Sequence, residues 1–165
     1  MPPYRICFVC SGNICRSPSA EIVTRRLVAK AGLDGLVEVD SAGTGGWHVG
    51  NDADARAVAA LRRRGYEVSR HRARRFRPAD FAERDLVVAL DSGHERELRA
   101  IAPTREDAAK VRLLRSYDPE LAAGADPDVL DPYYGDDGDF DDVLAVVEAA
   151  CRGLLVQITP LLQMR

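Results

Sequence analysis

The sequence predicts a three-layer α/β fold, in which a four-stranded parallel sheet lies between helices on both faces. Short apolar runs alternate with amphipathic segments along all 165 residues, and strands that alternate with helices join through right-handed crossovers into a parallel sheet. The composition is typical of a soluble globular protein, since 46% of the residues are hydrophobic and 30% are charged. The length predicts one domain over residues 1–165.

The first half of the chain contains two strand–helix units. Tyr4–Val9 is a short apolar run that suits a buried strand. We expect Ser17-Pro18 to open a helix, with Ser17 as its N-cap and Pro18 in its first turn, and Gly32 to close it. A second strand is predicted at residues 36–40, and residues 52–64 predict a helix with one apolar face.

The second half repeats this alternation and adds one long loop. The expected elements are a strand at residues 85–90, a helix that begins with the capping-box signal Ser92-Gly93-His94-Glu95, a strand at residues 111–115, a loop rich in Pro, Gly and Asp at about residues 116–138, and a last helix from about Asp139 that Pro160 bends or ends. In such folds ligands bind beyond the carboxyl ends of the strands. That rule indicates the loop at residues 10–16 and the loop after the fourth strand.

Charge and hydropathy exclude several kinds of partner. A net charge of −3 argues against a nucleic-acid binder that relies on a positive surface field. No uninterrupted apolar run approaches the roughly 20 residues of a membrane span. The N-terminus also lacks the charged-then-apolar layout of a signal peptide. We therefore expect a cytoplasmic protein with no nucleic-acid or membrane partner.

The loop after the first strand has the composition of an anion site with a nucleophile. It reads Cys10-Ser11-Gly12-Asn13-Ile14-Cys15-Arg16-Ser17 and leads directly into a helix. The first turn of a helix has unpaired N–H groups and the positive end of a dipole, so a curled loop there aims several amides at one anion. Arg16 can bind two phosphate oxygens with its planar fork, and the same positive environment favours a thiolate at Cys10.

Three residues of this loop have supporting properties. Gly12 permits unusual backbone angles, and Asn13 is among the few non-glycine residues that tolerate the left-handed region. Ser17 can donate a hydrogen bond to the Cys10 sulfur. The parts together predict a phosphate cradle with a nucleophile at its base.

Other interpretations of the cysteines remain to be weighed. Cys7 and Cys10 are spaced like half of a zinc site or a thioredoxin-like redox pair, but the sequence contains no second cysteine pair to complete a zinc site. We favour Cys7 as a buried strand residue. The loop also lacks the Gly-Lys-Ser/Thr sequence of a nucleotide-binding P-loop.

The segment C-S-G-N-I-C-R-S after a first strand resembles the signature of the low-molecular-weight protein tyrosine phosphatases. Four further segments resemble parts of that family in the same order: Ser41-Ala42-Gly43-Thr44, His71-Arg72-Ala73-Arg74, Ser116-Tyr117-Asp118-Pro119 and Asp131-Pro132-Tyr133-Tyr134-Gly135. The resemblance covers essentially the whole chain. It implies a flavodoxin-like or Rossmann-like sheet in a bacterial member of the family, and hydrolysis of phosphotyrosine in proteins through a phosphocysteine intermediate.

The resemblance and the chemistry of the loop together assign roles in that reaction. Cys10 is expected to attack phosphorus, while Arg16 and the main-chain amides of the loop hold the phosphoryl oxygens. The phosphate-binding residues would be Ser11, Gly12, Asn13, Ile14, Cys15, Arg16 and Ser17. A tyrosyl leaving group needs a proton donor. Three Asp-Pro pairs could supply it, at Asp118, Asp126 and Asp131, or each could merely start a turn; the resemblance favours Asp131.

Further residues are expected around this centre. Trp47, Tyr133 and Tyr134 would form aromatic walls for a phenyl ring, although Trp47 could instead be a core residue. In the family that the chain resembles, an Asn in the loop is held by a Ser and a His, which implies a support network of Asn13, Ser17, Ser41 and His71. By itself, His71 would be a surface residue in a basic stretch (Arg70, Arg72, Arg74, Arg75 and Arg77). We interpret that stretch as a solvated face rather than a docking site for acidic phosphopeptides.

Redox behaviour, partners and rival functions complete the expectations. Oxidised Cys10 could condense with Cys15 into a protective disulfide. No cofactor and no metal is expected, and the partners would be phosphotyrosine proteins or peptides and a tyrosine kinase, with the protein a monomer.

One rival is a thioredoxin-coupled arsenate reductase of similar fold, but residues 81–91 lack the extra cysteines of its disulfide relay. The other is a non-catalytic phosphotyrosine-binding module.

Overall fold

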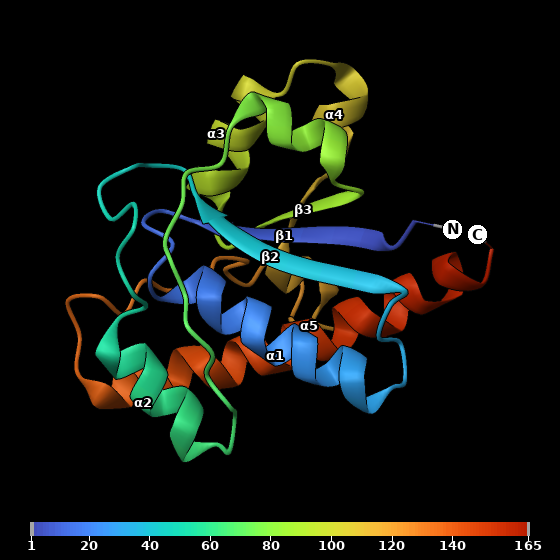
Figure 1. Ribbon diagram of the computed structural model, residues 1–165. Coiled ribbons are helices and arrows are strands. Elements are labelled where there is room, and N and C mark those ends of the chain that lie inside the picture. Colours follow the sequence, from blue (N-terminus) through green and yellow to red (C-terminus); the bar gives the residue numbers. More distant parts are fainter. Residues whose placement is uncertain (1, 165) are drawn as a thin grey trace.

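The expected three-layer architecture is confirmed by a computed structural model of the chain, which describes residues 2–164. Its sheet has four parallel strands in the order β2-β1-β3-β4. Their bounds are Tyr4–Cys10 for β1, Val37–Gly43 for β2, Leu86–Ala89 for β3 and Val111–Leu113 for β4. The carboxyl ends of the strands, and the loops that follow them, lie on the side of the molecule away from both termini (Figure 1).

Helices cover both faces of this sheet (Figure 1). One face carries α1 (Arg16–Lys30), α2 (Ala55–Arg63) and the long α5 (Asp137–Gln163), and the other carries α3 (Ser92–Ile101), α4 (Arg105–Ala109) and the 3₁₀-helix η1 (Pro78–Glu83). A second 3₁₀-helix, η2 (Leu114–Tyr117), follows β4 and packs against α5. Two hydrophobic cores result, one under each layer of helices.

The central strand β1 divides its side chains between the two cores. Ile6, Phe8 and Cys10 pack into the core under α1 and α5, whereas Cys7 and Val9 pack into the other one. Successive side chains of a strand point to opposite faces, so positions three apart cannot meet. The pairing of Cys7 with Cys10 in a zinc or redox site is therefore excluded, and Cys7 is a buried strand residue as expected.

Two predicted helix starts were wrong by one or two residues. The first helix begins at Arg16 after Cys15, which caps it without a side-chain hydrogen bond, and Ser17 lies inside the first turn. For α3 the N-cap is Asp91, whose side chain accepts a hydrogen bond from the His94 amide. In both places the N-cap is also the last residue of the loop after a strand. Sequence signals for a helix start do not show where that loop ends.

Other differences concern short or irregular elements. The sequence interpretation missed α4, η1 and η2, which are too short to show a hydrophobic period. The last helix begins at Asp137, after a capping box formed by Asp136 and Asp139, and continues past Pro160 to Gln163 instead of ending there. The Thr159 hydroxyl donates a hydrogen bond to the Leu155 carbonyl, one turn earlier in the helix.

Helix α5 is long and apolar enough to cross a membrane by length and composition alone. The sequence interpretation did not find such a segment, because Glu148 and Arg152 interrupt the apolar run. In the structure one side of α5 packs against α1, and seven of its residues are buried: Phe140, Leu144, Val147, Ala150, Cys151, Leu154 and Ile158. Such burial is what a core helix of a soluble protein requires, so this helix is weak evidence for a membrane span.

Candidate active site

The predicted phosphate loop connects the carboxyl end of β1 to the first turn of α1. Cys10 is the last residue of β1, and its side chain is only 3% exposed. The Cys10 sulfur lies 2.9 Å from the Ser17 hydroxyl, which can donate a hydrogen bond to a thiolate. Because the helix starts at Arg16, its unpaired amides lie next to this sulfur. The positions therefore combine a nucleophile with the positive end of a helix.

Asn13 holds the loop in a curled conformation. Its backbone φ is 57°, the left-handed region that was expected for it. The side-chain amide donates to Ser17 Oγ at 2.8 Å and to Ser41 Oγ at 2.9 Å, and its carbonyl oxygen accepts from the Arg74 amide at 3.0 Å. With this buried side chain fully bonded, the loop is shaped before any ligand arrives.

The outer partners of Asn13 come from two distant segments. The His71 ring donates to the Asn13 carbonyl at 2.6 Å, so His71 is half-buried at the loop and is not a free surface residue. The Ser41 hydroxyl donates to Glu21 at 2.6 Å, which leaves its oxygen free to accept from Asn13. The four expected support residues thus lie together, joined by Arg74 and Glu21, which the sequence interpretation missed.

Two substitutions of Asn13 separate the contribution of its side-chain hydrogen bonds from that of its left-handed backbone conformation. Asn13→Ala removes three hydrogen bonds and puts a side chain with no local bonding into the left-handed region, so we expect the unfolding free energy to fall by on the order of 3 kcal/mol. Asn13→Gly removes the same bonds but tolerates the backbone angle. Denaturant unfolding should therefore rank the alanine variant below the glycine variant. Equal stabilities would show that the backbone angle costs nothing here.

Gly12 is required for a different reason from the one expected. It does not have a positive φ. A Cβ atom there would lie 2.7 Å from Cδ2 of His48, and one on Gly43 would lie 2.7 Å from the Ser11 carbonyl oxygen. A side chain at position 43 would therefore collide with the backbone of the loop, whereas one at position 12 would displace the His48 ring from the loop.

Arg16 is buried beside Cys10 and is held from two directions. Its Nη1 donates to Asp91 Oδ2 and to the Val129 carbonyl, each at 2.9 Å. Burial alone would raise the pKa of Asp91, but the hydrogen bond from the His94 amide and the bond and charge of the Arg16 guanidinium outweigh it and lower that pKa. An ionised Asp91 consequently fixes the orientation of the guanidinium, whose Nη2 lies near Asp131.

The tertiary structure distinguishes the three Asp-Pro pairs. Each aspartate starts a turn by accepting a main-chain N–H two residues on: Asp118 from Glu120, Asp126 from Asp128, and Asp131 from Tyr133. Among the three, Asp131 alone lines a pocket with Cys10. Its Oδ2 lies 3.6 Å from Arg16 Nη2, and half of its side chain is exposed. Asp131 is thus the carboxyl group placed to reach a ligand bound over Cys10.

Aromatic residues surround the mouth of this pocket, which has a volume of about 290 Å³. Trp47 is 74% exposed and Tyr134 is 95% exposed, so the interpretation of Trp47 as a core residue is wrong. The Tyr133 ring meets that of Tyr134 edge-on at 5.0 Å between centroids, and the His48 ring centroid lies 6.2 Å from that of Tyr133. All three predicted pocket residues line the cavity, and His48, which was not predicted, joins them.

The loop at residues 131–135, which carries Asp131, is bonded to α2 through Arg56. Arg56 donates to the Tyr133 carbonyl at 2.9 Å and to the Gly135 carbonyl at 3.3 Å, and its guanidinium lies 5.5 Å from the Tyr133 ring centroid. Asp54 pairs with the same guanidinium at 3.0 Å. These contacts explain how an irregular segment holds Asp131 in a fixed place.

Comparison with known proteins identifies the family. The model of the low molecular weight phosphotyrosine protein phosphatase family matches residues 5–163. The chain belongs to this family. A low molecular weight protein-tyrosine-phosphatase of Streptomyces coelicolor is 60% identical over 155 residues, covering 94% of this chain and 93% of that protein.

Solved structures of the phosphatase family agree. A protein tyrosine phosphatase of Entamoeba histolytica, crystallised with Hepes in its active site, superposes with a TM-score of 0.89 at 32% identity, covering 95% of this chain and 97% of that one. YfkJ of Bacillus subtilis gives a TM-score of 0.88 at 36% identity and covers 96% of both chains. The arrangement around the phosphate loop therefore belongs to a phosphatase scaffold.

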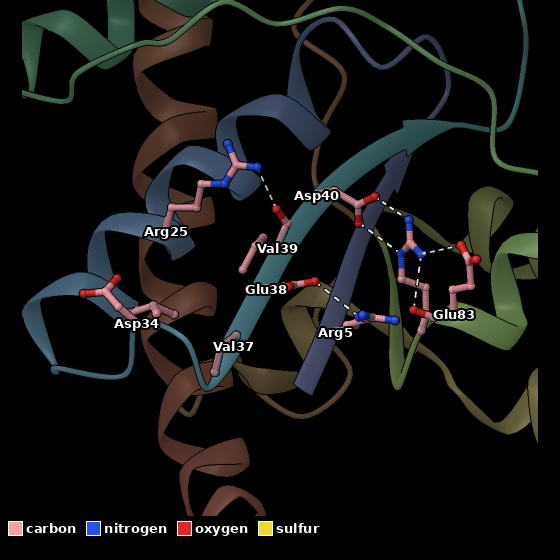
Figure 2. A pocket seen from close by; sticks show the side chains of 10 residues that line it. Arg5, Arg25, Asp34, Val37, Glu38, Val39, Asp40 and Glu83 are labelled. Atoms are coloured by element: carbon pink, nitrogen blue, oxygen red, sulfur yellow. Dashed lines mark hydrogen bonds and ion pairs between the residues drawn. The ribbon is translucent and has the colours of Figure 1, made fainter. Parts of the chain in front are cut away.

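A larger cavity lies elsewhere on this phosphatase. It has a volume of about 710 Å³ and lies at the outer edge of β2, toward the amino ends of the strands. Most of its charged residues are paired: Arg5 with Glu38, and Arg84 with Asp40 and Glu83, while Arg25 donates to the Val39 carbonyl (Figure 2). Because no nucleophile lies among the residues that line the larger cavity, the smaller pocket above Cys10 is the candidate site.

Proposed function

We propose that the pocket above Cys10 hydrolyses phosphotyrosine in proteins, with Cys10 as nucleophile, Arg16 and the loop amides as the phosphate site, and Asp131 as general acid and base. One observation carries the proposal: the sulfur, the guanidinium and the carboxyl group line the same cavity, although they lie up to 121 positions apart in the sequence (131 − 10). Membership of the phosphatase family supports it.

In the first step the Cys10 thiolate attacks phosphorus in line with the tyrosyl oxygen. A sulfur–phosphorus bond forms as the phosphorus–oxygen bond breaks, and Asp131 gives its proton to the departing phenolate oxygen. Charge spreads over three phosphoryl oxygens, where the α1 amides and the Arg16 guanidinium stabilise it. Asp91 and the Val129 carbonyl hold that guanidinium, so it needs little reorganisation in the transition state.

In the second step water attacks the phosphocysteine. Asp131, now ionised, takes a proton from the water as the oxygen–phosphorus bond forms and the sulfur–phosphorus bond breaks. The products are inorganic phosphate and the Cys10 thiolate. The Ser17 hydroxyl, 2.9 Å from the sulfur, supports the departing thiolate by a hydrogen bond.

The depth of the nucleophile supports a preference for phosphotyrosine. Cys10 is buried beneath a rim formed by Trp47, Tyr133 and Tyr134. A phosphotyrosine ring can stack between these walls and reach the sulfur, whereas the shorter phosphoserine side chain cannot. Paired peptides that differ only in phosphotyrosine or phosphoserine test this, with phosphate release as the readout. Equal rates on both peptides, or arsenate-dependent oxidation of thioredoxin, would contradict the proposal.

We also propose that the enzyme acts as a cytoplasmic monomer on proteins that a tyrosine kinase has modified. The arsenate reductase alternative has little support in the fold. Cys151 is buried in α5 against α1, where its thiol faces the Ala20 carbonyl, and it does not line the pocket above Cys10. The disulfide relay of that rival needs two further cysteines around the third strand, and none of the described residues of β3 or its flanks is a cysteine.

We propose that Cys15 protects the nucleophile from oxidation. Burial and the nearby Asp54 carboxylate raise the pKa of the Cys15 thiol well above its usual value, so Cys15 stays protonated. We propose that peroxide oxidises the Cys10 thiolate to a sulfenic acid with release of hydroxide, and that the Cys15 thiol then condenses with it to a disulfide with loss of water.

Peptide mapping tests this redox step. After mild peroxide treatment we expect a Cys10–Cys15 disulfide, with activity restored by a thiol reductant. In Cys15→Ser the same treatment should convert Cys10 to its sulfinic and sulfonic acids, and activity should not return. Sulfonic acid at Cys10 in the wild-type protein, with Cys15 still free, would rule out the protective role.

A further inference from the structure

A buried histidine outside the proposed chemistry touches the phosphate loop. His94 lies in the first turn of α3 and is 3% exposed. Its Nε2 lies 2.8 Å from the Ser11 hydroxyl, and its Nδ1 lies 3.2 Å from Asp91 Oδ1. Ser11 follows the nucleophile directly, and Asp91 binds Arg16 through its other oxygen. The ring therefore lies between partners at both ends of the loop.

The protonation of His94 follows from its surroundings. Burial lowers the pKa of His94 and Arg16 adds to this effect, while Asp91, Glu97 and Asp131 oppose it. The neutral ring carries one proton. Nδ1 has no aligned hydrogen-bond partner among the described residues, but it faces the Asp91 carboxylate, which favours the proton there. Nε2 is then the acceptor for the Ser11 O–H.

We propose that His94 is a positioning residue that holds the Ser11 end of the phosphate loop from its α3 side. It binds the Ser11 hydroxyl directly, and its other ring nitrogen faces Asp91. The Asn13 network holds the middle of the loop from the opposite side, toward β2. The inference rests on the proposed function in one respect, namely that this loop binds the phosphoryl group.

Two substitutions separate the two contacts of the ring. The terminal amide of glutamine lies as many bonds from Cβ as Nε2 does, so His94→Gln can keep the contact with Ser11. The amide of asparagine lies where Nδ1 does, so His94→Asn keeps only the contact with Asp91 and leaves the Ser11 hydroxyl unpaired. The pair thus tests the direct contact with a change of one methylene group.

The experiment measures the dissociation constant for inorganic phosphate by calorimetry, together with kcat/KM on a phosphotyrosine peptide, both per folded protein. We expect His94→Gln to stay within about twofold of wild type, and His94→Asn to weaken phosphate binding and lower kcat/KM by about tenfold each. In a Ser11→Ala background, His94→Gln and His94→Asn should differ by less than about twofold in the dissociation constant and in kcat/KM, since the contact with the Ser11 hydroxyl is already lost.

Several outcomes would overturn the positioning role. These are wild-type phosphate binding in His94→Asn, equal loss in both variants, or an effect of the same size in the Ser11→Ala background. A lowered melting temperature with unchanged binding and kcat/KM per folded protein would likewise show a merely structural residue. A wild-type protein that binds phosphate but hydrolyses no phosphopeptide would refute the proposed function alone, because the binding measurement still tests His94.

Discussion

Cys10→Ser should lower phosphotyrosine hydrolysis by at least about 10⁴-fold while leaving inorganic phosphate bound. A serine hydroxyl is not ionised near neutral pH, and the positive end of α1 does not lower its proton affinity enough to make it a nucleophile. The cradle survives, because Arg16 and the loop amides do not depend on the sulfur. Steady-state kinetics measure the loss of hydrolysis, and calorimetric titration measures the retained binding of phosphate.

Cys151→Ser is the matched control for that substitution. It makes the same chemical change at a buried cysteine of α5 that lies outside the pocket. The control should lose some stability, because a hydroxyl replaces a thiol in an apolar core, but its kcat per folded protein should equal that of wild type. Retained turnover in Cys10→Ser, or a comparable loss in Cys151→Ser, would refute the assignment of Cys10 as nucleophile.

Asp131→Asn should reduce turnover in proportion to how much the leaving group needs a proton. With a tyrosyl leaving group, whose conjugate acid has a pKa of about 10, we expect a loss of about 10²- to 10³-fold. With p-nitrophenyl phosphate, whose leaving group departs readily as an anion, the loss in the first step should be much smaller. Burst kinetics on both substrates separate that step from hydrolysis of the phosphocysteine.

Asp118→Asn and Asp126→Asn are the controls for the acid. Both aspartates precede a proline and start the same kind of turn, so asparagine can retain the turn while the carboxyl group is lost. Neither lines the pocket above Cys10. Their turnover should match wild type for every leaving group. A leaving-group dependence in either of them, or its absence in Asp131→Asn, would move the general acid elsewhere.

The sequence alone determined the elements whose signal is local. The continuous apolar run of β1 predicts a strand that is buried on both faces, because a central parallel strand needs helices above and below it. Cys10, Arg16 and the positive φ of Asn13 follow from residue types within one short loop, whose shape is decided by neighbouring amides. Family resemblance then supplied Asp131 and His71, for which spacing offered no preference.

The tertiary structure decided which distant groups meet. Asp91, His94 and Arg56 give no signal beyond a helix cap or a surface charge, yet crossovers of the parallel sheet bring them to the carboxyl edge beside the loop. The exposure of Trp47 and the choice of Asp131 over two similar Asp-Pro pairs are likewise long-range properties. A local pattern specifies the conformation of a few neighbouring residues, whereas a site built from several strand ends exists only once the sheet has assembled.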